Sequence, residues 1–221
     1  MGRWRTVPEP EISGDLIEAE EQRKDRVRLL LERYGILFRE LLQRELPAFR
    51  WQAVFRALRI MELSGEVLSG VFFNGIPGPQ FISQQTFRTL QRGSPDDRIF
   101  WINAADPASV CGIGLDSLRA AVPPRLSSTH LVYRGKDLVL VSKRNGEGLL
   151  IHAGPDDPRL QEYFVSLLHL LHRKFQPLKR IAIETINEEE APHSPYVPAF
   201  RLSFDVSVEP RQVTLYRKPD Y

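Results

Sequence analysis

The residues best suited to contact a nucleic acid lie in a predicted helix over residues 49–63. Gln52, Arg56 and Arg59 are spaced i, i+4 and i+7, so they share one helix face, opposite an apolar stripe. Arg50 stands at the start of the same helix. Arginine side chains bind phosphates, and glutamine and arginine side chains read base edges. These four residues are the predicted DNA-binding residues, and an ordinary solvated helix face is the alternative interpretation.

Three carboxylates are candidates for a different chemistry, the activation of a water molecule for base excision. Asp106 follows a predicted strand, and Asp205 and Asp220 lie towards the end of the chain. An enzyme of this kind needs a carboxylate near the water and a pocket for a flipped base. No motif singles out one of the three. The position of Asp106 before Pro107 equally suits a side chain that accepts backbone N–H bonds in a turn.

Several other chemistries have no matching motif. The sequence contains no Gly-x-x-x-x-Gly-Lys-Ser/Thr loop, no Gly-x-Gly-x-x-Gly after a strand and no nucleophile elbow. We therefore expect no ATPase or helicase activity from this chain alone, and no cofactor. Cys111 is the single cysteine, and His169 and His172 form a pair without a third ligand at matching spacing. We accordingly expect no metal site.

The elements that position the DNA-binding candidates have the order of a winged helix-turn-helix domain. Helices are predicted over residues 16–34, 36–45 and 49–63, with stops at Gly35, Pro47 and Gly65. The predicted wing consists of a strand over residues 66–74, a Gly/Pro-rich turn over residues 75–79 and a strand over residues 80–83. A closing helix is predicted over residues 84–91. The wing contains no Lys or Arg, so it is poorly suited to hold phosphates.

The second half is predicted to be a mostly antiparallel, barrel-like β-rich module with one long packed helix. Strands are predicted over residues 98–104, 129–134, 137–143, 148–153, 180–186, 202–208 and 213–216. Residues 155–174 predict the helix, and residues 108–126 are expected to be irregular because Pro and Gly interrupt them. The fold class is therefore α+β. The predicted division is an N-terminal extension over residues 1–14, a winged-helix domain over 15–92 and a C-terminal module over 98–221, with a Gly/Pro-containing boundary at 93–97.

The composition is that of an ordinary globular protein. The chain has 221 residues, of which 42% are apolar and 26% are charged, and its net charge is +2. With so little net charge, DNA affinity must come from local clusters of cations, and we expect it to be weak and salt-sensitive. No apolar run reaches the roughly 18–20 residues of a membrane span. We therefore expect a cytoplasmic protein without a membrane partner.

Short segments along the chain form an ordered set that is specific as a whole. The two longest are RYGILFRE at residues 33–40 and FRALRIMELSGEV at residues 55–67. The others stand at residues 2–4, 70–73, 78–81, 104–107, 194–198 and 213–217. Together they resemble the C-terminal region of the large helicase-related (Lhr) family of DEAD/H-type helicases.

This resemblance implies a winged helix followed by a β-barrel module, downstream of a helicase motor of two RecA-like lobes. The C-terminal region of the family is similar to the AlkZ-type DNA glycosylases, and uracil-DNA glycosylase activity is attributed to it in some members. The resemblance therefore also implies a role in DNA repair. The chain departs from the family pattern because it contains neither the motor nor the upstream winged helices. The glutamine pair typical of the AlkZ active site is not matched by Gln84 and Gln85.

The sequence therefore predicts a DNA-binding C-terminal module of an Lhr-type DNA repair helicase. The expected partners are single-stranded or damaged duplex DNA and an Lhr helicase motor region. Two alternatives remain at this point, a uracil-type DNA glycosylase and a structural docking subunit for a separately encoded motor. Strand breaks after incubation with uracil-containing single-stranded DNA and alkali would favour the glycosylase, provided that they disappear when one candidate aspartate is replaced.

Overall fold

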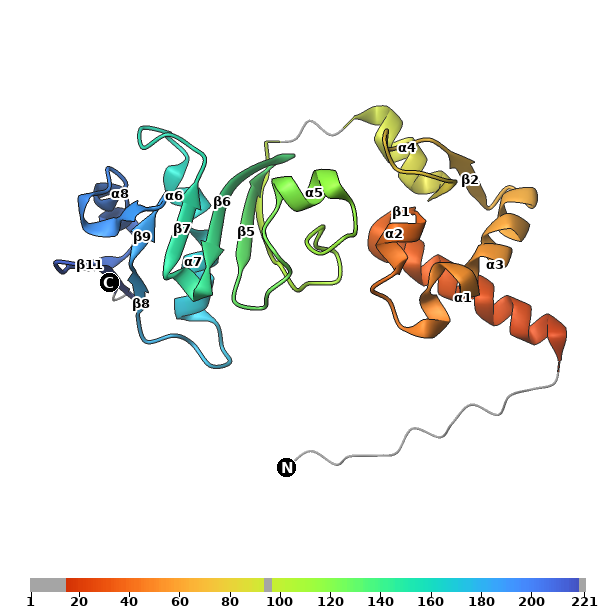
Figure 1. Cartoon of the computed structure of the whole chain (residues 1–221), viewed down its shortest axis with the longest axis horizontal. Coiled ribbons are helices and arrows are strands. Elements are labelled where there is room, and N and C mark those ends of the chain that lie inside the picture. Colours follow the sequence, from red (N-terminus) through yellow and green to blue (C-terminus); the bar gives the residue numbers. More distant parts are fainter. Residues whose placement is uncertain (1–14, 94–96, 219–221) are drawn as a thin grey trace, which may run out of the picture. The chain divides into compact units, whose positions relative to one another are not determined.

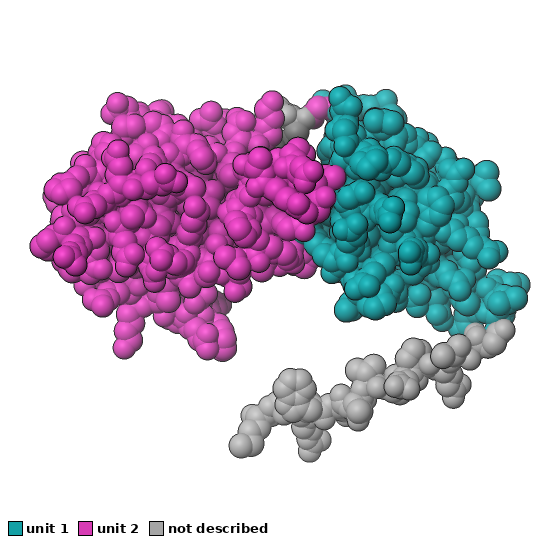
Figure 2. All heavy atoms as spheres, in the orientation of Figure 1, with its two compact units in different colours: residues 1–92 teal, residues 93–221 magenta. Residues whose placement is uncertain are grey.

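The computed structural model describes residues 15–93 and 97–218. The chain divides into two compact units, one ending at Arg92 and one beginning at Gly93 (Figure 2). The predicted boundary at residues 93–97 lies partly outside the described residues, as do the predicted extension over residues 1–14 and the candidate Asp220.

The first unit begins with the helix α1 (Leu16–Tyr34). Asp15 caps its N-terminus, where the side chain accepts a hydrogen bond of 2.9 Å from the backbone N–H of Ile17. Gly35 ends the helix at a φ of +74°, in the left-handed region that glycine adopts without strain. Both ends of this helix agree with the sequence prediction, because each depends on local residue types.

The predicted helix over residues 36–45 is wrong in part. Residues Ile36–Leu37 form the strand β1, and only Arg39–Leu42 form a helix, α2. A 3-10 turn, Pro47–Phe49, then leads into the next helix. Strand β1 exists because Ile36 and Leu37 pair with residues of the wing more than 40 positions later, a partner that local periodicity does not reveal.

A helix and a three-stranded sheet complete the first unit. Helix α3 (Trp51–Leu63) precedes β2 (Val67–Gly70), β3 (Gln80–Ser83) and α4 (Gln84–Arg92). The sheet has the order β1-β3-β2, and all its pairs are antiparallel. Helices α1 and α3 pack against each other over a core that includes Leu30, Leu58 and Met61 (Figure 1). The order of helices followed by a hairpin wing confirms the winged-helix prediction.

The second unit contains a six-stranded sheet of order β10-β9-β7-β6-β5-β4. Its strands are β4 (Ile99–Asn103), β5 (His130–Arg134), β6 (Asp137–Lys143), β7 (Gly148–Ile151), β9 (Thr185–Ile186) and β10 (Glu189–Glu190). The pair β7–β9 is parallel, and the other pairs are antiparallel. A second, three-stranded sheet has the order β11-β12-β8, built from β11 (Asp205–Val208), β12 (Val213–Tyr216) and β8 (Ile181–Ile183).

Buried cores lie on both faces of β5 in the six-stranded sheet. The helices that contribute to the main core are α6 (Leu160–Tyr163), α7 (Val165–His172) and α8 (Val197–Ser203), and α7 packs on β4 and β5 (Figure 1). The rings of Phe164, Phe200 and Phe204 pack together in the main core. A smaller core around Cys111 and Leu131 lies on the other face of β5, under the segment that carries α5 (Asp116–Ala121).

The α+β class is confirmed, but five predictions for the second half are wrong, wholly or in part. The strands form two open sheets, and no closed barrel is found among the described residues. The predicted long helix is interrupted at Phe164, between α6 and α7, and the predicted irregular segment 108–126 contains α5. The predicted strand 180–186 divides at Glu184 into β8 and β9, which belong to different sheets. Residues 202 and 203, predicted as strand, end α8.

No helix in the described part of the chain is both long enough and apolar enough to cross a membrane.

Candidate nucleic-acid interface

Helix α3 presents the predicted DNA-binding residues to solvent. Its opposite face is fully buried through Val54, Ala57, Leu58 and Met61. On the other side of the helix, the side chains of Gln52, Arg56 and Arg59 are exposed. Arg50, which directly precedes the helix, is exposed as well. The structure thus brings all four predicted residues to the surface of one element.

The four residues differ in how free their side chains are. Arg50 is the N-cap residue of α3, and its Nε donates a hydrogen bond of 3.0 Å to the backbone carbonyl of Glu45. Arg59 forms an ion pair of 2.6 Å with Glu62, three residues further along the helix. The guanidinium of Arg56 has no hydrogen-bond or ion-pair partner among the described residues. Of the three arginines, Arg56 can therefore bind a phosphate without first breaking another contact.

Glu62, a carboxylate on the solvent side of α3, was not among the residues predicted for this face. One of its oxygens forms the ion pair with Arg59, and the other accepts a hydrogen bond from the hydroxyl of Ser69 on β2. This carboxylate ties the end of α3 to the wing and partly neutralises the basic face. Its spacing of i+3 from Arg59 was the available sequence signal, because such pairs lie side by side on a helix.

The wing is held in place by the buried side chain of Gln80. Its Oε1 accepts hydrogen bonds from the backbone N–H groups of Phe72 and Phe73, at 3.0 and 2.8 Å. Its Nε2 donates to the carbonyl oxygens of Phe73 and Ile76, at 2.8 and 3.4 Å. The rings of Phe72 and Phe73 pack edge-on against Phe87 and Phe38. The wing is thus ordered by its own domain, and it offers no cation to DNA.

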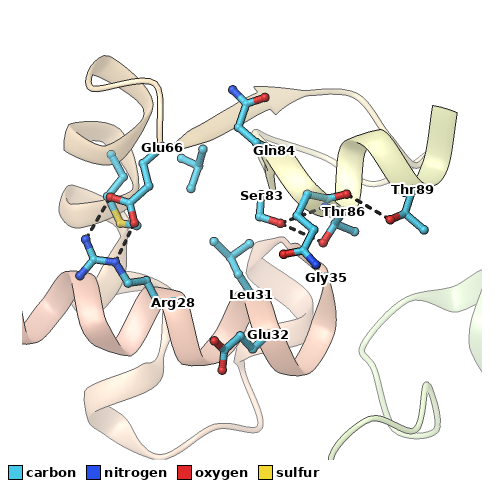
Figure 3. Close-up of a pocket in the computed structure, with 12 residues that line it drawn as sticks. Arg28, Leu31, Glu32, Gly35, Glu66, Ser83, Gln84, Thr86 and Thr89 are labelled. Atoms are coloured by element: carbon cyan, nitrogen blue, oxygen red, sulfur yellow. Dashed lines mark hydrogen bonds and ion pairs between the residues drawn. The ribbon is translucent and has the colours of Figure 1, made fainter. Parts of the chain in front are cut away.

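A groove of about 590 Å³ lies between α1 and α4 (Figure 3). At one end, Arg28 and Glu66 form two hydrogen bonds of 2.6 and 3.0 Å, which hold the pKa of the Glu66 carboxyl below its usual value. Ser83, Thr86 and Thr89 line the other end, where Ser83 and Thr86 bond to each other (Figure 3). Arg28 is the one cation among the residues that line the groove, and it forms ion pairs with Glu66 and Asp25, so the groove offers no unpaired cation to an anionic ligand.

The groove also contains Gln84 and Gln85, the adjacent glutamines of α4. Gln84 donates a hydrogen bond of 3.2 Å to the carbonyl of Gly65, which ties α4 to the end of α3. No aromatic side chain lines the groove to stack on a base. We therefore assign it no base-recognition role.

The two candidate carboxylates that the structure describes, Asp106 and Asp205, are not brought together into a catalytic site. The side chain of Asp106 is exposed, and its Oδ1 accepts a hydrogen bond of 2.8 Å from the backbone N–H of Ala108, which is the turn-capping arrangement. Asp205 is exposed at the start of β11, in the three-stranded sheet of the second unit. Asp220 lies outside the described residues. Neither described aspartate lines a described pocket.

Replacement of Asp106 by Ala is expected to lower the free energy of unfolding of the second unit by about 0.5–1.5 kcal/mol, the value of one such hydrogen bond. Asp106→Asn is expected to stay near the wild-type value, because the amide oxygen accepts the same bond. Urea denaturation of both variants measures the difference. An equal loss in the two variants would show that the charge of Asp106, rather than its turn contact, matters.

The histidines and the cysteine do not form a metal centre. Cys111 is buried, and His169 packs against the ring of Trp101, with 4.4 Å between ring centroids. His130 is buried, and burial is the main reason why its pKa is lowered to about 4, with the charges of His169 and Arg173 as smaller causes. In residues 15–93 and 97–218, no three His, Cys, Asp or Glu side chains lie close enough to hold a metal ion.

Comparisons with known proteins agree with the fold and with the resemblance in sequence. Residues 17–99 match the winged-helix domain of the large helicase-related protein. The chain is also 26% identical, over 181 residues, to the Lhr helicase/uracil glycosylase of Escherichia coli (strain K12). This match covers 78% of the chain but only 12% of the length of the relative.

Proposed function

We propose that this chain is a DNA-binding module related to the Lhr helicases, because residues 17–99 match the winged-helix domain of the large helicase-related protein. The contact runs through the exposed face of α3, which carries Arg50, Gln52, Arg56 and Arg59. In winged helix-turn-helix proteins the equivalent helix enters the major groove, where arginine and glutamine reach phosphates and base edges.

The observation that carries this proposal is the guanidinium of Arg56, which has no hydrogen-bond or ion-pair partner among the described residues and lies on a helix whose other face is fully buried. A structural surface arginine commonly has a carboxylate at i+3 or i+4, as Arg59 has Glu62. Arg56 has Ile60 at i+4 and another arginine at i+3, so its charge has no local counterion on the helix. Bound phosphate would supply that counterion.

The finer role is a module of an Lhr-type DNA repair helicase, acting together with a helicase motor region. The support for this role is the name of the Escherichia coli relative, which is a helicase and uracil glycosylase. We do not extend the glycosylase activity to Asp106 or Asp205, because Asp106 caps a turn and Asp205 is exposed on a strand. The DNA contact on α3 does not depend on either residue.

The proposal is tested by the salt dependence of duplex DNA binding. Arg56→Ala is expected to reduce the log–log salt slope by about 0.9, the value of one phosphate contact on duplex DNA. Glu62→Gln is expected to steepen the slope by up to about the same amount, because it frees Arg59 to bind a phosphate. Fluorescence anisotropy with a labelled duplex at several salt concentrations measures both effects.

The matched control is Arg211→Ala, which removes the same charge from an exposed arginine of the second unit. This variant is expected to keep the wild-type slope. If Arg56→Ala and Arg211→Ala have the same slope and affinity, α3 is only a solvated surface. A structural docking module would then be the better assignment.

A further inference from the structure

The loop between α7 and β8, residues 173–180, is the most basic stretch of the second unit and plays no part in the proposed α3 contact. Its sequence is RKFQPLKR, with four cations, one phenylalanine and no carboxylate. No Asp or Glu occurs between Glu162 and Glu184. This cluster was not among the predicted binding residues, although cations interleaved with an aromatic residue are typical of segments that bind single strands.

Specific contacts give the loop a defined shape. Its far end is anchored where the backbone N–H of Leu178 donates a hydrogen bond of 2.9 Å to the carbonyl of Leu170, and the Leu178 side chain packs on the main core. Nearer the helix, Nε of Arg173 donates a bond of 2.8 Å to the carbonyl of Gln176, which has a φ of +48°. Between these anchors the loop projects away from the sheets (Figure 1). The ring of Phe175 is consequently 79% exposed.

The cations of the loop are not neutralised by neighbouring carboxylates. Lys174, Lys179 and Arg180 are exposed, and none has an ion-pair partner among the described residues. In contrast, the arginines at positions 28, 134 and 159 all form ion pairs with carboxylates. A cluster of uncompensated cations favours an anionic partner.

We propose that this loop binds single-stranded DNA. Lys174, Lys179 and Arg180 hold successive phosphates, and the ring of Phe175 stacks on an unpaired base. A single strand fits better than a duplex because stacking on an exposed ring requires an open base face, which a duplex covers with its own neighbouring bases. An anionic membrane fits less well, because one phenylalanine supplies little apolar surface for insertion.

The stacking part of the proposal is tested by the pair Phe175→Leu and Phe175→Tyr in the full chain. Stacking of a base on an aromatic ring contributes about 1–3 kcal/mol, so loss of the ring is expected to weaken binding about 5- to 150-fold. Phe175→Tyr keeps a ring and is expected to bind within about twofold of wild type. Anisotropy with a labelled oligothymidine measures both affinities, and circular dichroism checks that both variants are folded.

The charge part is tested by a matched pair of double variants. Lys174→Gln with Lys179→Gln removes two loop cations, whereas Lys136→Gln with Lys143→Gln removes two exposed lysines elsewhere in the same unit. Each phosphate contact on a single strand contributes about 0.7 to the salt slope, so the loop variant is expected to reduce the slope by about 1.4. The control variant is expected to keep the wild-type slope.

Two results would overturn the proposal: equal oligothymidine affinities for Phe175→Leu and Phe175→Tyr, or equal slopes for the two lysine variants. Sedimentation with vesicles of phosphatidylcholine and phosphatidylserine tests the membrane instead. Vesicle binding that is lost in Phe175→Leu, with unchanged oligothymidine binding, would assign the loop to a lipid surface. The loop proposal does not depend on α3. Duplex binding tests Arg56→Ala, whereas oligothymidine binding tests the loop variants, so either proposal can fail without the other.

Discussion

Gln80→Leu is expected to lower the free energy of unfolding of the first unit by about 2–4 kcal/mol and to release the wing. The Gln80 side chain is fully buried and makes hydrogen bonds to backbone groups of Phe72, Phe73 and Ile76. Leucine fills a similar volume but satisfies none of these groups. Each buried donor or acceptor that loses its partner costs about 1–3 kcal/mol, and partial access of water to the wing reduces the sum.

Hydrogen exchange followed by mass spectrometry measures this effect, because it reports on each unit separately. We expect residues 71–80 to lose protection most and the second unit to stay unchanged. The matched control is Gln91→Leu, the same change at an exposed position of α4, which is expected to stay within about 0.5 kcal/mol of wild type. Unchanged protection of the wing in Gln80→Leu would mean that the ring contacts alone hold it.

Gln80→Leu also separates the contribution of the wing to duplex DNA binding from that of the α3 cations. Because the wing has no cation, its release is expected to leave the salt slope of duplex binding unchanged. A reduced slope in Gln80→Leu would indicate that the wing positions a phosphate contact, for example through the bond between Ser69 and Glu62.

Gly146→Ala is expected to destabilise the second unit by about 3 kcal/mol or more. Gly146 has a φ of +105°, where an alanine costs about 1–2 kcal/mol. A Cβ at this position would also clash with Cγ2 of Ile181, a buried residue of β8. Overpacking of this kind typically costs about 1–3 kcal/mol, because the neighbour cannot move without disturbing the core.

A double-mutant cycle with Ile181→Ala isolates the steric contact. Ile181→Ala removes the clashing methyl group, so the double variant is expected to be more stable than the sum of the single effects by at least about 1 kcal/mol. Hydrogen exchange of residues 160–186 follows each variant. Strict additivity of the two single effects would show that backbone strain alone accounts for Gly146→Ala. Gly75→Ala serves as the strain control, since Gly75 has a φ of +79° with no atom near its virtual Cβ.

The contact between Gly146 and Ile181 bears on the loop proposed to bind single strands. Residue 181 is the first residue of β8 and directly follows that loop, so the close packing at Gly146 fixes one end of it. The other end continues from α7. A variant that loosens β8 is therefore expected to weaken oligothymidine binding without removing any cation.

The sequence by itself determined the elements whose signals are local. Helix α1 was predicted with both of its ends, because Asp15 and Gly35 act on adjacent backbone groups. The exposed face of α3 followed from its spacing, since a helix repeats every 3.6 residues whatever surrounds it. The strands β3, β6 and β12 and the winged-helix order were likewise readable from alternation and turn residues.

Only the tertiary structure decided the features that depend on distant partners. Residues 36 and 37 became a strand because β3 is available to pair with them, although their local pattern also suits a helix. The segment 180–186 divides between two sheets because β8 pairs with β12 and β9 pairs with β7. Spacing placed Arg56 and Arg59 on one face, but only the fold paired Arg59 with Glu62, a carboxylate that also contacts the wing, while Arg56 has no such partner in the described part of the chain. Such choices rest on contacts between residues far apart in the chain, and a local pattern carries no information about the partner.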